Sequence, residues 1–237
     1  MNNIQIKAQD IQKDFHNGFS IKKVSFSLNG GTTVAFLGPN GAGKSTLFQL
    51  LTGNYELTAG KIWLEKEELT IDHVHLRKKI GYLPQDPRLP KWVSGIELLR
   101  YAASLHQLKN PQQIVQATLS YWDCDSFKNV PLEICSHGMQ KRIGLALATI
   151  HDPHYLILDE PFSGLDMYHM HSLENTIIAR QKKGKLTIIS THIAPYVAKL
   201  CQKVFVIKAG KLDRVKDWET FDDTKRMHVI KEHFINA

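Results

Sequence analysis

A glycine-rich segment near residue 40 carries the strongest chemical signal in the sequence. It is Gly38-Pro39-Asn40-Gly41-Ala42-Gly43-Lys44-Ser45-Thr46. Glycines let a backbone wrap tightly and turn its N–H groups towards an anion. A helix that starts directly after them adds the positive end of its dipole, about half an elementary charge. With a lysine and a hydroxyl group beside it, such a loop can hold a phosphate chain and a divalent cation.

The segment matches the P-loop pattern G-x-x-x-x-G-K-[ST] in the context that this pattern requires. Residues 32–37 predict a strand before it, and residues 44–52 predict a helix after it. We expect Lys44 to reach the β- and γ-phosphates of a nucleoside triphosphate and the Ser45 hydroxyl to ligate Mg²⁺. The alternative is a glycine-rich turn with a chance lysine, and the flanking strand and helix argue against it.

Two acidic residues close an apolar run further along the chain. Residues 155–158 are Tyr-Leu-Ile-Leu, which predicts a buried strand, and Asp159 and Glu160 follow. Ligands bind beyond the carboxyl ends of parallel strands, the edge at which the P-loop also lies. We expect Asp159 to hold Mg²⁺. Because strand residues alternate between faces, Glu160 should point elsewhere and accept a proton from an attacking water. Together the motifs predict hydrolysis of Mg-ATP or Mg-GTP, and solvated acids at an ordinary strand end are the weaker alternative.

Alternating strands and helices are the elements that must position these groups. Apolar, β-branched runs predict short strands at 32–37, 80–83, 155–159, 186–190 and 204–208. Helical spacing predicts helices at 44–52, 96–105, 114–121, 136–150 and 165–183. This alternation is typical of an α/β core with a mainly parallel sheet.

Two parts of the chain depart from the alternation. Residues 4–8 and 21–28 alternate apolar and polar side chains, which predicts an antiparallel β layer. The middle of the chain is mostly helical and contains no strong strand. We therefore expect a single domain over residues 1–237. Within it we expect an α/β core at 1–88 and 152–237 and an inserted helical subdomain at 89–151.

Four further motifs lie in a fixed order along the chain. They are Gln85 after the strand 80–83, the helix start Ser136-His137-Gly138-Met139-Gln140-Lys141-Arg142, the turn Ser163-Gly164-Leu165-Asp166, and the pair Thr191-His192. With the P-loop and the carboxylate strand, this order resembles the ABC (ATP-binding cassette) ATPases, in which P-loop, Q-loop, signature, Walker B, D-loop and switch histidine follow one another. The resemblance covers about residues 4–211 and implies ATP and Mg²⁺ as cofactors.

The resemblance also implies a role for each matched residue. Phe15 matches the aromatic residue that stacks on adenine. Gln85 matches the residue that contacts Mg²⁺ and the attacking water and couples the site to the helical subdomain. Asp166 matches the D-loop acid at a subunit interface, and His192 matches the switch histidine, whose imidazole can donate a hydrogen bond to the γ-phosphate. The implied catalytic residues are Glu160, His192, Gln85 and Lys44.

The signature segment implies a second subunit. Ser136 is a good N-cap, and the start of its helix favours an anion. In ABC proteins this anion is the γ-phosphate bound by the opposite subunit, so the resemblance implies that Ser136 and Gly138 contact nucleotide across a head-to-tail dimer with a second copy or a close relative. The usual signature is Leu-Ser-Gly-Gly-Gln. Cys135, His137 and Met139 replace its first, third and fifth residues, whereas Gly138 still permits close approach to phosphate.

A transporter ATPase working on an integral membrane permease is the function that this resemblance implies. No run of 18 apolar residues occurs in the sequence, so we expect the membrane-spanning part to be another chain. The three cysteines are odd in number and lack C-x-x-C spacing, so we expect reduced thiols in a cytosolic compartment and no disulfide framework or zinc site. We expect a peripheral location on the cytoplasmic face of the cell membrane. The stretch 95–101 and the signature ending in Met139 resemble exporter-type cassettes.

Two other functions compete with this reading. The net charge of +7 permits nucleic acid as the partner of a soluble ABC ATPase, on DNA, RNA or ribosomes. However, Lys44 and Ser136 are only 92 residues apart, which leaves no room for the long coiled coil of the chromosome and repair members. Translation-factor members usually carry two cassettes, and this chain has one, so we do not expect nucleic acid to be the partner. The altered signature keeps a weakly hydrolysing regulatory ATP-binding module as the third possibility.

Overall fold

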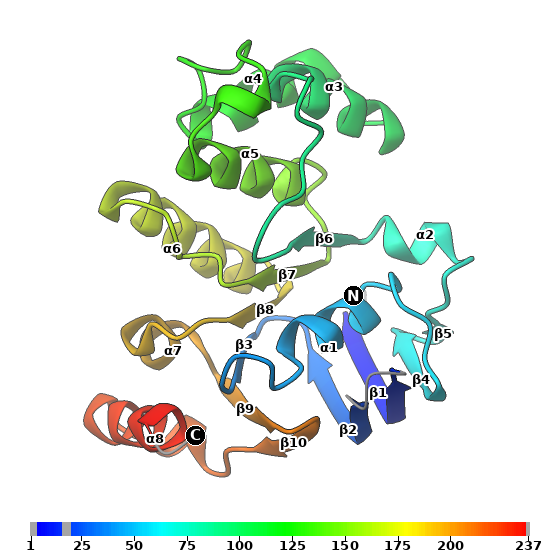
Figure 1. Cartoon of the computed structure of the whole chain (residues 1–237), viewed down its shortest axis with the longest axis vertical. Coiled ribbons are helices and arrows are strands. Elements are labelled where there is room, and N and C mark those ends of the chain that lie inside the picture. Colours follow the sequence, from blue (N-terminus) through cyan, green and yellow to red (C-terminus); the bar gives the residue numbers. More distant parts are fainter. Residues whose placement is uncertain (1–3, 16–19, 236–237) are drawn as a thin grey trace.

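The computed structural model describes residues 4–15 and 20–235, in which the strands form two sheets (Figure 1). The strands are β1 (Gln5–Asp14), β2 (Ser20–Asn29), β3 (Thr33–Leu37), β4 (Ala59–Leu64), β5 (Glu67–Glu68), β6 (Ile80–Leu83), β7 (Tyr155–Asp159), β8 (Leu186–Ser190), β9 (Lys203–Lys208) and β10 (Lys211–Arg214). The helices are α1 (Lys44–Leu51), α2 (Val74–Arg77), α3 (Gly95–Leu105), α4 (Pro111–Tyr121), α5 (His137–Thr149), α6 (Met167–Lys182), α7 (Ala194–Leu200) and α8 (Asp223–Ile235). None of these helices has the length and apolar character that crossing a bilayer requires.

The larger sheet is mainly parallel, as the alternation of strands and helices predicts. Its order is β10-β9-β3-β8-β7-β6, and every neighbouring pair is parallel except β10 with β9. β6, β7 and β8 have the bounds expected from the sequence. The carboxyl ends of β3, β7 and β8 therefore lie along one edge, where the segments that follow them can meet.

Both faces of this sheet are buried, which explains its uninterrupted apolar strands. Every residue of β3 is buried. Val34 and Phe36 belong to a core cluster shared with α1 and the smaller sheet. Ala35 and Leu37 belong to a second cluster shared with α5, α6 and α7. Because successive side chains of a strand point to opposite faces, one short strand holds two cores together.

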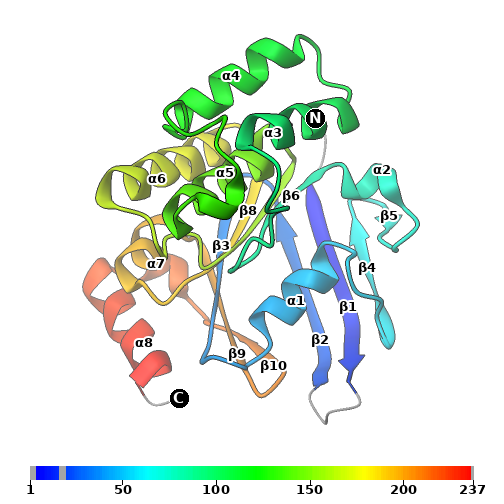
Figure 2. The same ribbon diagram turned by 45° about the horizontal axis from the view of Figure 1, so that its top comes forward.

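The smaller sheet confirms the antiparallel layer expected near the N-terminus. β1 pairs antiparallel with β2 and with β4, and β5 extends the sheet beyond β4. Buried and exposed residues alternate from Val24 to Leu28, as in a sheet with one solvated face. β1 and β2 are longer than predicted, and the sequence analysis did not predict β4 or β5. In both views this sheet lies on the opposite side of the molecule from α6, α7 and α8, with α1 between (Figures 1 and 2).

The helices α3, α4 and α5 gather at one end of the molecule and pack on one another (Figure 2). Ser94 and Glu97 start α3 with a capping box, in which the Glu97 carboxylate accepts from the Ser94 N–H at 2.8 Å. Ser136 caps α5, as the sequence predicts. α5 also packs against β6, and so joins this helical block to the larger sheet. The subdomain boundaries at 89 and 151 remain a prediction.

The chain after Gly210 forms structure that its basic composition does not predict. β10 pairs with β9, and α8 packs on α7. Trp218 is fully buried, and its indole N–H donates to the Cys201 carbonyl at 2.9 Å. This segment therefore covers the end of the larger sheet at which β9 lies.

Gly81 marks a close contact between β6 and the end of α5. A Cβ atom added at Gly81 would lie 1.9 Å from the backbone oxygen of Ala148 and 2.8 Å from the ring of Pro153. We predict that Gly81→Ala lowers the free energy of unfolding by about 2–3 kcal/mol, because the strand or the helix must shift. Urea denaturation of the purified protein measures this loss.

Gly184→Ala provides the control for this prediction. Gly184 has a φ of 72°, and an added Cβ atom would lie more than 4 Å from the described residues other than its chain neighbours. Only the cost of a left-handed backbone, about 1 kcal/mol, is expected there. Equal losses in the two variants would contradict the close packing of Gly81.

Candidate functional site

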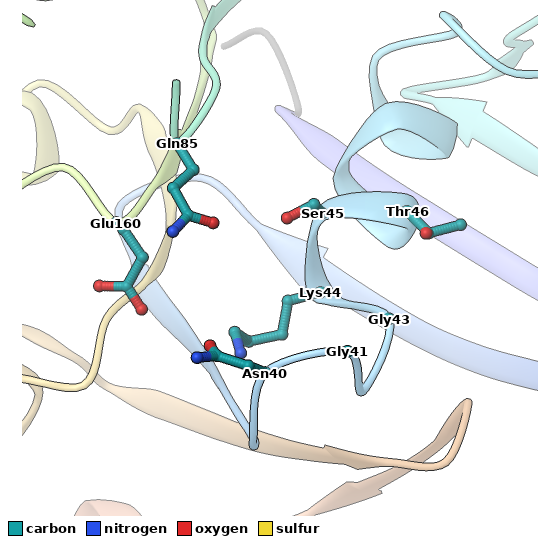
Figure 3. Close-up of a pocket in the computed structure, with 8 residues that line it drawn as sticks. All are labelled: Asn40, Gly41, Gly43, Lys44, Ser45, Thr46, Gln85 and Glu160. Atoms are coloured by element: carbon teal, nitrogen blue, oxygen red, sulfur yellow. The ribbon is translucent and has the colours of Figure 1, made fainter. Parts of the chain in front are cut away.

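The loop that joins β3 to α1 frames a cavity of about 330 Å³. Figure 3 shows loop side chains on one side of the cavity and those of Gln85 and Glu160 on the other. The lining residues are Asn40, Gly41, Gly43, Lys44, Ser45, Thr46, Gln85 and Glu160. Residues that follow β3, β6 and β7 in the sequence therefore meet in one place.

Glycines give the loop its shape. Gly43, directly before α1, has a φ of 111°, in the left-handed region that favours glycine. A Cβ atom at Gly38 would lie 2.2 Å from the backbone oxygen of Ile207, so the loop also needs glycine to pass β9. Within the loop, the Ala42 N–H donates to the Pro39 carbonyl at 3.2 Å. α1 starts at the cavity, and the positive end of its dipole favours an anion there.

Lys44 turns its ammonium group back on its own loop. Nζ donates to the backbone oxygens of Gly38 at 2.7 Å and Pro39 at 3.0 Å. Burial lowers the pKa of Lys44, and the negative charges of Glu160 and Asp159 act in the opposite direction. A phosphate chain entering the cavity would replace the two carbonyls as the partner of this cation.

Ser45, Asp159 and Ser190 share hydrogen bonds beside the cavity. Ser45 Oγ donates to Asp159 Oδ2 at 2.5 Å, and Ser190 Oγ donates to Asp159 Oδ1. Hydroxyl and carboxylate oxygens are the ligands that Mg²⁺ prefers. The contact between Ser45 and Asp159 thus fits their predicted magnesium role, and Gln85, the third predicted ligand, lines the same cavity. Ser190 was not predicted, although its place at the end of a parallel strand could have indicated it.

Glu160 lies one residue beyond β7 and leaves the path of the strand. Its φ of 46° is left-handed, and its backbone N–H donates to the Ser190 carbonyl at 3.1 Å and to the Ser190 hydroxyl at 3.0 Å. Its Oε2 lies 2.9 Å from Nδ1 of His192. The sequence predicted that Asp159 and Glu160 point in different directions because strand residues alternate between faces. Glu160 lies beyond the strand, so this reason does not apply to it. A left-handed turn, a conformation that costs about 1–3 kcal/mol and clusters at functional sites, orients the Glu160 carboxylate.

Gln85 follows β6 and turns its side-chain amide into the cavity (Figure 3). Its backbone oxygen accepts a hydrogen bond from Nζ of Lys141 at 3.0 Å. Lys141 belongs to α5 and is buried. The signature helix thus contacts the loop that carries Gln85, and the sequence analysis did not predict this contact.

Ser136, Gly138 and Asp166 lie outside the cavity lining but near the start of two adjacent helices. Ser136 caps α5, and a Cβ atom at Gly138 would lie 3.0 Å from the backbone oxygen of Gly164, in the turn before α6. Asp166 caps α6 by accepting from the His169 N–H at 2.9 Å. Ser136, Gly164 and Asp166 are exposed. The starts of α5 and α6 therefore form one exposed surface, which we call the exposed edge.

Phe15 lies beside Tyr55, also outside the cavity lining. The two ring centroids are 6.0 Å apart in an edge-to-face arrangement, and Nζ of Lys13 lies 5.5 Å from the Phe15 centroid. Tyr55 is exposed and was not predicted as a site residue from its place in the sequence. Adenine stacking by Phe15 remains a prediction, and Tyr55 adds a second aromatic ring at the same place.

Comparison with known proteins shows to which family this chain belongs. The sequence profile described as ABC transporter matches residues 21–163, which contain the P-loop, Gln85, the start of α5 and the two carboxylates. The chain belongs to the ABC transporter family. Its fold is that of the ATP-binding subunits of this family, with a P-loop core, an antiparallel β layer and a mainly parallel sheet.

Several ABC transporter relatives are about one third identical to this chain over the aligned residues. An uncharacterised ABC transporter ATP-binding protein of Nostoc sp. is 32% identical over 221 residues, which cover 87% of this chain and 64% of the relative. The protein YxlF of Bacillus subtilis, also uncharacterised, is 34% identical with coverage of 87% and 69%. The Nod factor export ATP-binding protein I of Bradyrhizobium diazoefficiens is 31% identical with coverage of 89% and 69%. The chain therefore spans less than two thirds of the Nostoc relative.

Solved structures of ABC proteins superpose on most of the chain. The structure of cbiO1 from Clostridium perfringens, part of the ABC transporter complex cbiONQ, has a TM-score of 0.76 and 26% identity, covering 99% of this chain and 97% of its own. The dimeric ATP-binding cassette MJ0796, bound to ADP and Pi, has a TM-score of 0.80 and 19% identity, covering 89% and 99%. At such low identity the second likeness supports the fold alone.

Proposed function

We propose that this chain hydrolyses ATP and that the hydrolysis drives transport, in the direction of export, through a separate membrane subunit. The convergence of Lys44, Ser45, Gln85 and Glu160 on one cavity carries the proposal. They supply a cation for phosphate, oxygen ligands for Mg²⁺ and a carboxylate base. This is the set of groups that phosphoryl transfer to water requires.

The P-loop side of the cavity would bind the nucleotide. Lys44 would exchange its two loop carbonyls for the β- and γ-phosphates, and the N–H groups at the start of α1 would bind phosphate oxygens. Ser45 and Asp159 would hold Mg²⁺, with Gln85 as a further ligand. When bound, Mg²⁺ neutralises the charge that develops on the phosphate oxygens.

The opposite side of the cavity would act on the attacking water. Glu160, held by its left-handed turn, would orient this water and accept its proton. His192 contacts the same carboxylate and would donate a hydrogen bond to the γ-phosphate. Gln85 would position the water between the phosphate and the base.

The exposed edge at the starts of α5 and α6 supports the inference that a second subunit binds there. Ser136 and Gly138 lie outside the cavity of their own chain, so they are available to the nucleotide of a partner. MJ0796, an ATP-binding cassette of the same fold, is described as dimeric and bound to ADP and Pi. We infer a head-to-tail dimer with a second copy or a close relative, in which Phe15 stacks on adenine and Asp166 lies at the interface.

Export and a membrane partner are inferred from the relatives. The Bradyrhizobium relative is described as a Nod factor export protein, and the cbiO1 structure is described as part of a transporter complex. The stretch 95–101 and Met139 support the same direction. We propose that the chain lies at the cytoplasmic face of the cell membrane, bound to an integral permease.

Fractionation of cells that produce the full chain tests the partner. We expect the chain to sediment with membranes, to resist a salt wash and to co-purify with an integral membrane protein after gentle solubilisation. Salt-sensitive association with RNA or DNA would instead support the nucleic-acid alternative. ATP turnover by the purified protein separates a transport ATPase from a weakly hydrolysing regulatory module.

A further inference from the structure

Lys141 is a buried cation that has no role in the proposed mechanism. Only 1% of its surface is exposed, although it lies in the signature helix α5. A buried ammonium group costs free energy unless it is paired and hydrogen-bonded. Nζ donates to the backbone oxygen of Gln85 at 3.0 Å, 56 residues earlier in the chain. This bond links α5 directly to the loop that carries a proposed magnesium ligand.

The acids of the candidate site also act on Lys141. Burial lowers the pKa of Lys141, and the carboxylates of Asp159, Glu160 and Asp86 oppose this change by favouring its ammonium form. Asp159 and Glu160 act in the same way on Lys44. The two site acids therefore favour the charged forms of one lysine from the P-loop helix and of a second from the signature helix.

The next residue of α5 makes a second connection. Nη1 of Arg142 donates to the Asp123 carbonyl at 2.6 Å and lies 3.0 Å from Nε2 of His169. Nδ1 of His169 lies 2.7 Å from Oδ1 of Asp166. At two consecutive residues, α5 is thus bonded to the loop after β6 and, through His169, to the turn before α6. The start of this helix is the part proposed to contact the nucleotide of the partner.

We propose that Lys141 is a positioning residue for Gln85 and that it connects the two nucleotide sites of the dimer. A helix that offers its start to the partner's nucleotide also fixes the loop that presents Gln85 to the nucleotide of its own chain. A shift of α5 when its start engages phosphate would move the Gln85 backbone with it. This inference rests on the proposed ATPase function.

The variant Lys141→Met tests the positioning role, because it keeps an unbranched side chain and loses the donor. We expect kcat to fall about tenfold or more, since small displacements of a positioning group have effects of this size. The Mg²⁺ concentration for half-maximal activity should rise. The affinity for ATP without Mg²⁺, which depends on Lys44, should stay within about twofold.

A double-mutant cycle with Gln85→Ala separates positioning from a general loss of structure. In the Gln85→Ala protein, Lys141→Met should change kcat by less than about twofold, because no side chain is left to position. Reductions that multiply in the double variant would overturn the proposal, and so would wild-type kcat in Lys141→Met. Ile143→Ala is the control, because Ile143 is equally buried in α5 and faces Gly95. Its effect should be the same with and without Gln85.

If Lys141→Met does not fold, Lys141→Gln replaces it in the double-mutant cycle with Gln85→Ala. Its amide is shorter and uncharged, so we expect a smaller fall in kcat, which should again disappear in the Gln85→Ala protein. A wild-type protein without ATP turnover would overturn the proposed function and this inference together. A wild-type protein that hydrolyses ATP, with multiplying reductions in the cycle, would overturn this inference alone.

Discussion

Glu160→Gln is expected to bind ATP and to lose turnover, with kcat lower by about 10²- to 10⁴-fold. Glutamine keeps the size of the side chain and can still bond to His192, which lies 2.9 Å from the native carboxylate. Its amide cannot accept the proton of the attacking water. ATP therefore remains bound, and we expect a dimer to accumulate with ATP and Mg²⁺. Phosphate release and size-exclusion chromatography with light scattering measure the two effects.

Glu174→Gln is the matched control for this variant. Glu174 and Glu160 are 7% and 8% exposed, and Glu174 pairs with Lys199 between α6 and α7. Because the Lys199 side chain is 61% exposed, loss of this ion pair should lower stability by no more than about 1 kcal/mol, while turnover should remain. Normal ATP hydrolysis by Glu160→Gln would show that another group accepts the proton.

Lys44→Ala is expected to abolish nucleotide binding under ordinary assay conditions. The ammonium group now donates to two loop carbonyls and would donate to two phosphates in the complex. Charge-assisted hydrogen bonds contribute about 1.5–3 kcal/mol each, so the dissociation constant for ATP should rise by at least about a hundredfold. Isothermal titration with Mg-ATP measures this change.

A control variant and the pH dependence of the wild-type protein test the role of Lys44. Lys61→Ala removes an exposed lysine of β4 that pairs with Glu68 at 2.7 Å, and ATP affinity should not change. In the wild-type protein, burial lowers the pKa of Lys44, so its charge is lost at a lower pH than that of an ordinary lysine. ATP affinity should accordingly weaken as the pH rises into the alkaline range. Binding of ATP to Lys44→Ala with unchanged affinity would remove the P-loop from the proposed mechanism.

Regular periodicity made the core of this fold predictable. β6, β7 and β8 are short apolar runs bounded by polar residues, and their observed bounds equal the predicted ones. α1, α3, α5 and α6 lie within one or two residues of their predicted bounds. α2, α7, β4 and the segment after Gly210 were missed, because they are short or basic and their positions depend on tertiary packing. Trp218, buried against the Cys201 carbonyl, shows how such packing overrides composition.

The candidate site was predictable where a local motif determines it. Lys44, Ser45, Gln85 and Glu160 were singled out from the sequence and line one cavity. The left-handed turn at Glu160 was not predictable, because it depends on bonds to Ser190 in a neighbouring strand. The contact of Lys141 was hidden for a similar reason, since its partner is a backbone oxygen that any residue at position 85 would supply.

The two outer strands of the larger sheet bear on how the chain associates. Open strands with free N–H and C=O groups can pair with other chains and cause aggregation. β6 and β10 have only four residues each, and β10 reads Lys-Leu-Asp-Arg. Short length and alternating charge both discourage such β-augmentation. The outer strands of the larger sheet are therefore poor templates for edge-to-edge pairing with other chains.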